Sequence, residues 1–272
     1  MDEQIRLNRF LAERLGVSRR QADEMIAKGR VRVNGQVAGL GGRVTATDRV
    51  EVLRGEQRAD RVEVRDGRRV IRQAGPKAVV TEGAHREAGA WHVVPWSVRH
   101  IYLAMNKPVG YVCSRRRQDA APTIYELLPA DLRNLKTVGR LDKDSEGLIL
   151  LTNDGEFGFR MTHPKFAKHK LYEVELDRAL EPLHQQMIGD FGVELKDGRS
   201  QLSLTKLDDG RQRWQVEMSE GRNRQIRRTF GALGYTVTRL KRLEFGPYRL
   251  SGLQPGEWCE LTKANSGAGG KA

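Results

Sequence analysis

The sequence has few of the residues and motifs that define several large classes of protein. Only two cysteines, Cys113 and Cys259, occur among 272 residues, and no CxxC pair is present. This usage argues against a disulfide framework and a cysteine-ligated zinc site. Apolar runs are far shorter than a membrane-spanning helix, the N-terminal segment has no signal-peptide core, and P-loop and dinucleotide fingerprints are missing. We therefore expect a cytoplasmic protein with no cofactor, no metal and no membrane partner.

The charge of the chain is its strongest global feature. Lys and Arg total 48 against 35 Asp and Glu, so the net charge is +13 and the isoelectric point is about 10.0. A basic surface of this size favours a polyanionic partner through phosphate contacts. The alternative is a solubilised surface with no partner. Nucleic acid is favoured because the arginines recur at the boundaries of predicted elements and do not form one tail.

Residues 5–53 form a compact first block. Apolar residues on one face predict a helix over 5–15, which Gly16 ends. A capping-box pattern at Ser18 and Gln21 begins a second helix that runs to Lys28. The dipeptide Asn34-Gly35 then predicts a β-hairpin.

This two-helix block with a hairpin resembles the alpha-L RNA-binding domain first seen in a small-subunit ribosomal protein. Basic residues lie at its joints, as an RNA-binding module requires. The alternative is a generic helical cap on the next domain. The residues expected to contact RNA are Arg19, Arg20, Lys28, Arg30 and Arg32.

Residues 54–100 predict a linker that carries short strands. A hairpin is expected around Asp66-Gly67, followed by turn residues and short alternating runs. His85, His92 and His100 do not have the spacing of metal ligands, so we assign no chemistry to this segment.

Residues 101–262 predict a second, α+β domain. Strands outnumber helices and most neighbours are joined by turns, which favours a mainly antiparallel sheet with packed helices. The polar tail 263–272 is expected to be disordered. The expected strands are 101–108, 110–114, 148–152, 170–177, 202–207, 214–219 and 235–240, and the expected helices are 156–163, 182–191 and 224–234, with a capping box at Thr123 and Glu126.

The segment 139–148, GRLDKDSEGL, concentrates charge between apolar strands. Asp142, Asp144 and Glu146 resemble an oxygen cage for a metal, but the calcium-loop glycine is missing and cations are interleaved with the acids. A glycosidase pair needs a fixed separation of two carboxylates across a bond, which one loop does not show. A solvated turn explains the charges but not the flanking glycines. These residues alone leave open whether the loop presents an acid for chemistry.

Four further motifs accompany this loop in a fixed order. NKP begins at 106, LLTNDG follows the loop, K-x-Y spans 170–172, and EGRNRQIRR spans 220–228. Together with the first block, they resemble the ribosomal RNA pseudouridine synthases that carry an N-terminal alpha-L domain. The connector 54–100 is longer than this resemblance leads us to expect.

The resemblance implies roles for individual residues. Asp142 corresponds to the nucleophile, and Tyr172 to the residue that stacks on the target base and acts on a proton. Arg227 is expected to pair with Asp142 and keep it ionised, and Arg140 to hold the flipped-out nucleotide. Cationic residues expected to contact RNA in this domain are Arg140, Lys107, Arg222, Arg224 and Arg228.

The resemblance also implies a monomeric isomerase that acts on a uridine of ribosomal RNA, either free or in a ribosome-assembly intermediate. The loop residues DKDSEG (142–147) resemble those of enzymes that modify the large subunit, which favours a large-subunit uridine as the substrate. Attack at ribose C1′, attack at uracil C6 and abstraction of the 2′ proton all stay open. The rival hypotheses are a non-catalytic RNA-binding or ribosome-assembly factor and a metal-dependent nuclease.

Overall fold

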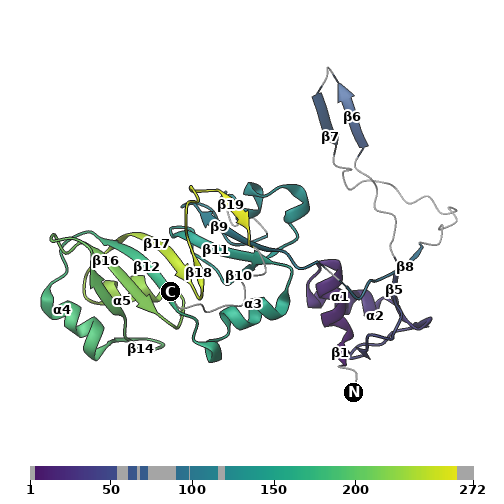
Figure 1. Ribbon diagram of the computed structural model, residues 1–272, viewed down its shortest axis with the longest axis horizontal. Coiled ribbons are helices and arrows are strands. Elements are labelled where there is room, and N and C mark those ends of the chain that lie inside the picture. The colour runs from purple at the N-terminus through teal and green to yellow at the C-terminus, as the bar shows by residue number, and fades with distance from the viewer. Residues whose placement is uncertain are drawn as a thin grey trace. The chain divides into compact units, whose positions relative to one another are not determined.

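The computed structural model of the chain describes residues 4–53, 61–65, 68–72, 90–97, 99–115 and 120–261, with 61–65 and 68–72 described by their backbone alone (Figure 1). Two compact units divide the chain, residues 1–98 and residues 99–272. Each is described by itself. No helix within the described ranges is long and apolar enough to cross a membrane. The tail that was expected to be disordered lies outside the described residues.

The two helices of unit 1 confirm the predictions from their caps. Helix α1, Leu7–Leu15, ends where Gly16 adopts a left-handed conformation with φ 69°. Helix α2, Arg19–Ala27, begins with the reciprocal capping box of Ser18 and Gln21. The predicted start of the first helix was two residues early, because Ile5 and Arg6 form strand β1 and pair with β4 (Arg43–Val44).

A small sheet completes unit 1. Its order is β3-β2-β5-β8, with bounds Gln36–Val37, Val31–Val33, Val50–Leu53 and Trp91–Val93. The predicted hairpin is confirmed, with Asn34 and Gly35 at φ 51° and 84° in the turn between β2 and β3. Strands β6 (Arg61–Arg65) and β7 (Arg68–Arg72) pair antiparallel, which confirms the second hairpin.

Unit 2 is built on a nine-stranded sheet with the main order β15-β16-β12-β17-β11-β9-β19. All its strand pairs are antiparallel except that of β11 with β17, so the prediction of a mainly antiparallel sheet is confirmed. The sheet strands are β9 (Tyr102–Lys107), β10 (Lys136–Val138), β11 (Glu146–Thr152), β12 (Lys170–Leu176), β15 (Ser203–Lys206), β16 (Arg213–Met218), β17 (Val237–Phe245), β18 (Tyr248–Arg249) and β19 (Trp258–Glu260).

Short helices and one hairpin accompany this sheet. The hairpin consists of β13 (Val193–Leu195) and β14 (Gly198–Ser200). The helical elements are η1 (Ile124–Leu127), η2 (Ala130–Leu132), α3 (Gly155–Thr162), η3 (Pro164–Phe166), α4 (Pro182–Gln186), η4 (Met187–Phe191) and α5 (Gln225–Ala232). The capping boxes of the sequence are present at Thr123 and Glu126, and Asp154 caps α3.

Strand β11 is buried on both faces. Ile149 and Leu151 belong to the main core cluster around Trp214, whereas Leu148 and Leu150 belong to a second cluster that includes Phe245. A strand covered on both sides reads as a continuous apolar run, which explains why residues 148–151 show no alternation. The strand therefore anchors the charged loop that precedes it.

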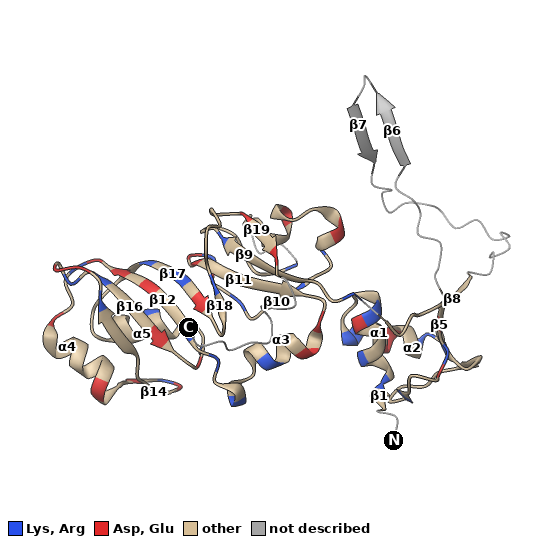
Figure 2. Ribbon diagram, viewed as in Figure 1, with Lys and Arg blue, Asp and Glu red and all other residues tan. Residues whose placement is uncertain are grey.

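Two predicted elements differ in the structure. Residues 110–114 were expected to form a strand, but only Val112 makes an isolated bridge, to Thr123, because Pro108 and Gly110 turn the chain away from the sheet. Residues 182–191 were expected to form one helix, but α4 widens into the π-helical turn η4 after Gln186. Charges on the open face of the sheet are paired across strands, as Glu173 is with Arg213 and Arg239 (Figure 2).

Candidate active site

The loop 139–145 leaves β10, and β11 follows it at Glu146. The two glycines of its motif have left-handed backbone conformations, φ 72° at Gly139 and φ 103° at Gly147. Gly147 pairs with Arg242 in the one parallel contact of the sheet, and a Cβ atom on Gly147 would overlap the backbone of Arg242. Glycine is therefore required at this position both by conformation and by the close approach of β17.

Lys107 fastens the loop from inside the domain. Its side chain is fully buried, and its Nζ donates to the carbonyl oxygens of Ser145 at 2.6 Å and Pro108 at 3.0 Å. Burial lowers the pKa of this lysine. The prediction that Lys107 contacts RNA is wrong, because an ammonium group with no exposed surface cannot reach a phosphate. Its role in the structure is to position the loop.

This correction can be tested by the salt dependence of RNA binding. We expect Lys107→Met to leave the slope of log affinity against log salt unchanged, and to lower stability by about 1–3 kcal/mol because two buried carbonyls lose their donor. Arg140→Met, which removes an exposed cation, is expected to reduce the slope by roughly 0.7–0.9. Titrations of a ribosomal RNA fragment at several salt concentrations check both. A reduced slope for Lys107→Met would restore it as a phosphate ligand.

Arginines from the start of α5 and from β17 pair with the acids of the loop. Arg224 donates to both oxygens of Asp144, at 3.0 and 2.8 Å, and lies 3.4 Å from Oδ2 of Asp142. The hydrogen bonds from Arg224 hold the pKa of Asp144 below its ordinary value. Glu146 pairs with Arg239 at 2.6 Å. Asp144 and Glu146 therefore fix the loop, whereas the side chain of Asp142 has only the longer contact of 3.4 Å with Arg224 among the ion pairs of the described residues.

The predicted partner of Asp142 is placed differently by the structure. Arg227 donates to the carbonyl oxygens of Asp144 at 2.8 Å and Val237 at 2.6 Å, and its Nε lies 3.3 Å from Oδ2 of Asp144. The cation in contact with Asp142 is Arg224, which sequence reasoning assigned to RNA. Arg224 takes this place because it lies one helical turn before Arg227 in the chain, and its backbone, at φ 47°, directs its guanidinium towards the loop.

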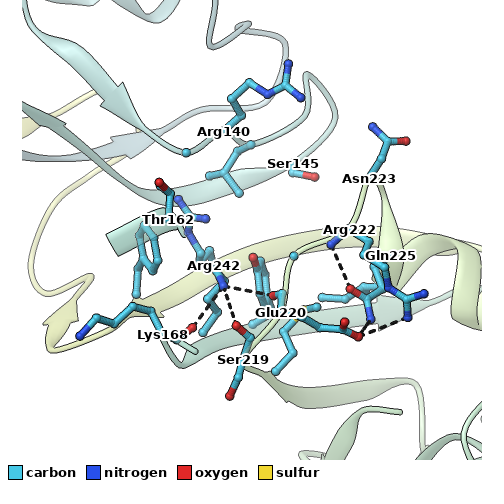
Figure 3. Close-up of a pocket in the computed structure, with 18 of the residues that line it drawn as sticks. Arg140, Ser145, Thr162, Lys168, Ser219, Glu220, Arg222, Asn223, Gln225 and Arg242 are labelled. Atoms are coloured by element: carbon cyan, nitrogen blue, oxygen red, sulfur yellow. Dashed lines mark hydrogen bonds and ion pairs between the residues drawn. The ribbon is translucent and has the colours of Figure 1, made fainter. Parts of the chain in front are cut away.

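A cavity of about 480 Å³ opens beside Asp142 (Figure 3). Tyr172, only 8 % exposed, lines it from β12. The register of the sheet explains this neighbourhood, because Arg242 of β17 pairs with Gly147 of β11 on one side and with Tyr172 on the other. The other buried apolar residues of the cavity wall are Leu141, Met161, Met218, Ile226, Leu240 and Phe245.

Three cations in this cavity, Lys168, Lys170 and Arg242, were missed by sequence reasoning. Arg242 is 2 % exposed, and its Nε donates to the carbonyl of Leu148 at 2.8 Å, whereas its Nη2 has no hydrogen-bond partner among the described residues. Lys170 donates to the carbonyls of Lys168, Ser219 and Glu220, and burial together with Arg242 lowers the pKa of Lys170 to about 8. The K-x-Y motif was a signal for Lys170, whereas Arg242 depends on strand register.

The other cations expected to contact RNA fall into two groups. Arg222 donates to the carbonyls of Gly198 and Arg199, and Arg228 forms a bidentate pair with Asp197, so both brace the β13–β14 hairpin. Arg30 donates to Leu53, and Arg32 stacks on Trp91 at 4.0 Å. The cations that stay exposed are Arg140 at the cavity and Arg19, Arg20 and Lys28 in unit 1.

The arrangement suits chemistry on an anionic polymer that carries flat groups. A carboxylate, an aromatic ring and several cations surround a cavity with apolar walls, and orphaned donors such as Arg242 Nη2 can bind oxygen atoms of a substrate. Within the described residues, no three metal-binding side chains come together. The residues present therefore offer an acid–base and binding site.

Comparisons with known proteins agree with this chemistry. Residues 101–232 match the family described as RNA pseudouridylate synthase, and residues 5–50 match the S4 domain. An "Uncharacterized RNA pseudouridine synthase" of Aquifex aeolicus is 32 % identical over 96 % of this chain and 91 % of the relative. A "Ribosomal large subunit pseudouridine synthase B" of Bacillus subtilis is 30 % identical over 94 % of this chain and 92 % of the relative. A crystal structure of a pseudouridylate synthase aligns with TM-score 0.60 and 30 % identity over 96 % of this chain and 98 % of that one.

Proposed function

This chain belongs to the family of RNA pseudouridine synthases with an N-terminal S4 domain, and we propose that it converts one uridine of large-subunit ribosomal RNA to pseudouridine with the carboxylate of Asp142 as the nucleophile. The observation that carries the proposal is the placement of Asp142, at the mouth of a cavity that Tyr172 lines, on a loop that Lys107 and Gly147 hold rigid. The large-subunit assignment is supported by the named relatives, which include a large-subunit enzyme.

The reaction needs no redox step and no external energy. The N1–C1′ bond of the uridine breaks, the uracil rotates in the cavity, a C5–C1′ bond forms, and a proton is lost from C5 while N1 gains one. An ionised carboxylate serves each of the three routes, namely attack at C1′, attack at C6 and removal of the 2′ proton. The positive Arg224 guanidinium lies 3.4 Å from Oδ2 of Asp142 and forms an ion pair with it.

Tyr172 and the cations would hold the extruded nucleotide. Flipping a uridine out of its stack costs a few kcal/mol, and stacking against an aromatic ring offsets part of that cost. Tyr172 lies on the same cavity wall as Arg242, and Arg140 lies exposed at the opening, within reach of a backbone phosphate. Tyr172 and Arg242 would therefore contact the base inside the cavity, and Arg140 would contact a phosphate outside it.

The S4 domain would supply the docking on folded ribosomal RNA. Three exposed cations lie on or beside α2, namely Arg19, Arg20 and Lys28. The structure shows no hydrogen bond or ion pair from their side chains to other described residues, so they can contact phosphates without breaking one. Phosphate contacts position a protein on its RNA but carry little sequence information. The choice of uridine therefore depends on the shape of the RNA and on contacts near the cavity.

Mapping of pseudouridines in ribosomal RNA tests the proposal. In a strain without this protein, we expect one or a few large-subunit sites to contain uridine in place of pseudouridine, and expression of the protein to restore them. Total RNA from both strains is compared by chemical labelling of pseudouridine and reverse transcription. Unchanged ribosomal RNA, or a change confined to the small subunit, would contradict the substrate assignment.

A further inference from the structure

An exposed aromatic cluster lies at the end of α3. The ring of His163 is 4.7 Å from that of Phe159 and 6.3 Å from that of Phe166, and the two phenylalanine rings are 5.9 Å apart and perpendicular. Phe159 is 47 % exposed and Phe166 is 36 % exposed. We refer to Phe159, His163 and Phe166 as the rim cluster. Its rings pack on one another at the surface instead of in the core, so parts of both phenylalanine rings stay exposed to a partner.

The backbone under the rim cluster is well ordered by local hydrogen bonds. His163 Nδ1 accepts from the amide of Lys165 at 3.2 Å, and Thr162 Oγ1 donates to the carbonyl of Gly158 at 2.7 Å. The short helix η3 closes with Ala167 in a left-handed conformation. The rings are therefore presented in a fixed arrangement before any partner binds, which reduces the entropy lost on binding.

The charge beside the rim cluster is positive. Lys165 Nζ lies 5.3 Å from the ring centre of Phe159 and 4.7 Å from that of Phe166. Lys168 follows in the same segment, and within the described ranges neither lysine has an ion-pair partner. Arg160 and Glu156 of α3 pair with each other at 3.1 Å, and Figure 2 shows basic residues in the turn that follows the helix. Aromatic rings interleaved with free cations match the bases and phosphates of single-stranded nucleic acid.

The rim cluster reaches the active-site cavity through His163, whereas Phe159 and Phe166 do not line it. His163 and Lys168 line the same cavity as Asp142 and Tyr172, and the neighbouring Thr162 and Lys168 extend along one side of it in Figure 3. A strand whose uridine enters this cavity must leave past its edges. Its adjoining nucleotides are unstacked by the extrusion and need a new surface.

We infer that the rim cluster is a stacking platform for an unpaired nucleotide next to the target uridine. This inference rests on the proposed function, since it assumes that the cavity receives a uridine. It specifies the substrate further, as a uridine in a loop, bulge or otherwise unpaired stretch of RNA. Stacking tolerates any base, so the platform contributes affinity for single-stranded RNA and little sequence preference.

The test measures binding by the full-length chain with Asp142→Asn, so that no turnover occurs. The probes are a single-stranded oligouridylate and an RNA duplex of equal length. Substitution of both Phe159 and Phe166 by Leu keeps apolar volume but removes the rings, and we expect single-strand affinity to fall roughly tenfold to hundredfold. Duplex affinity is expected to stay within about twofold, because duplex binding relies on phosphate contacts.

Phe191→Leu is the matched control. Phe191 is also an exposed phenylalanine, at 55 %, but it lies in η4, where no neighbouring residue of the chain lines the cavity, so we expect no change on either probe. Unchanged single-strand affinity of the double variant, an equal loss on duplex, or an equal loss in the control would overturn the inference. Unchanged RNA binding would assign the cluster to a protein partner instead. If the double variant unfolds early on heating, Phe166→Leu alone is expected to lose roughly fivefold on the single strand.

These results are separable from the test of the proposed function. Binding in the Asp142→Asn background does not depend on isomerisation, whereas pseudouridine mapping does not depend on the rim cluster. A stacking platform with no isomerisation would refute the proposed function alone. Isomerisation with no contribution from the rings would refute the platform alone.

Discussion

Asp142→Asn is expected to abolish isomerisation while RNA binding survives. The substitution keeps the size of the side chain and removes the charge, so the reacting carboxylate is lost with little change in packing. We expect the rate of tritium release from 5-tritiated uridine in ribosomal RNA to fall by roughly a thousandfold or more, as is typical when a nucleophile or general base is removed. Affinity for the same RNA, measured by filter binding, is expected to change by less than about threefold, since phosphate contacts dominate it.

Asp144→Asn is the matched control for this prediction. Asp144 lies two residues away in the same loop, but it does not line the cavity, and its side chain is 47 % exposed. Asparagine keeps one acceptor oxygen for Arg224, and Arg227 still donates to the backbone carbonyl of Asp144, so the loop keeps most of its contacts. We expect a loss of less than about tenfold. Equal losses for the two variants would show that the loop acts as a unit, and full activity of Asp142→Asn would refute the assignment of this residue.

Gly147→Ala is expected to destabilise unit 2 strongly. The added Cβ would meet the backbone of Arg242 while the residue stays at φ 103°, a conformation that alanine rarely adopts. Backbone strain and overpacking each cost about 1–3 kcal/mol, so we expect a loss of about 2–6 kcal/mol. For a unit of this size, that corresponds to a fall in Tm of roughly 5–15 °C in thermal unfolding followed by circular dichroism.

Gly110→Ala separates the two causes of this loss. Gly110 has a similar conformation, φ 92°, but a Cβ there would meet nothing within 4 Å. Only the conformational strain is added, and we expect about 1–2 kcal/mol. If the two variants lose the same free energy of unfolding, the close approach of β17 to the loop does not contribute to the loss. The backbone conformation of Gly147 would then be sufficient to explain why this position requires glycine.

The helices and hairpins of unit 1 were predictable because local rules decide them. A capping box at Ser18 and Gln21 and a two-residue Asn34-Gly35 turn satisfy backbone groups within a few residues, so they form as the sequence indicates. Residues 110–114 show the limit of this reasoning. Their apolar side chains suit a strand, but a strand also needs a partner edge, and the sheet offers none there.

The roles of the basic residues were predictable only in part. A lysine in NKP and the arginines of EGRNRQIRR carry the same charge whether they face RNA or the protein interior. The structure buries Lys107 under the loop and pairs Arg228 with Asp197, and it leaves Arg140 exposed. Composition indicates a polyanionic partner, but the direction of each side chain depends on which strands become neighbours.

The sequence by itself determined the class of fold, the two RNA-related modules and the motif that carries Asp142, because caps, turns, charge and motif order are properties of short segments. Only the tertiary structure decided what surrounds that acid. Arg242, Gly147 and Tyr172 lie side by side because β17 pairs with β11 and β12 in one register. Arg224 reaches Asp142 although 82 positions separate them in the chain. Such neighbours are set by long-range strand pairing, whose register depends on the whole sheet and its core.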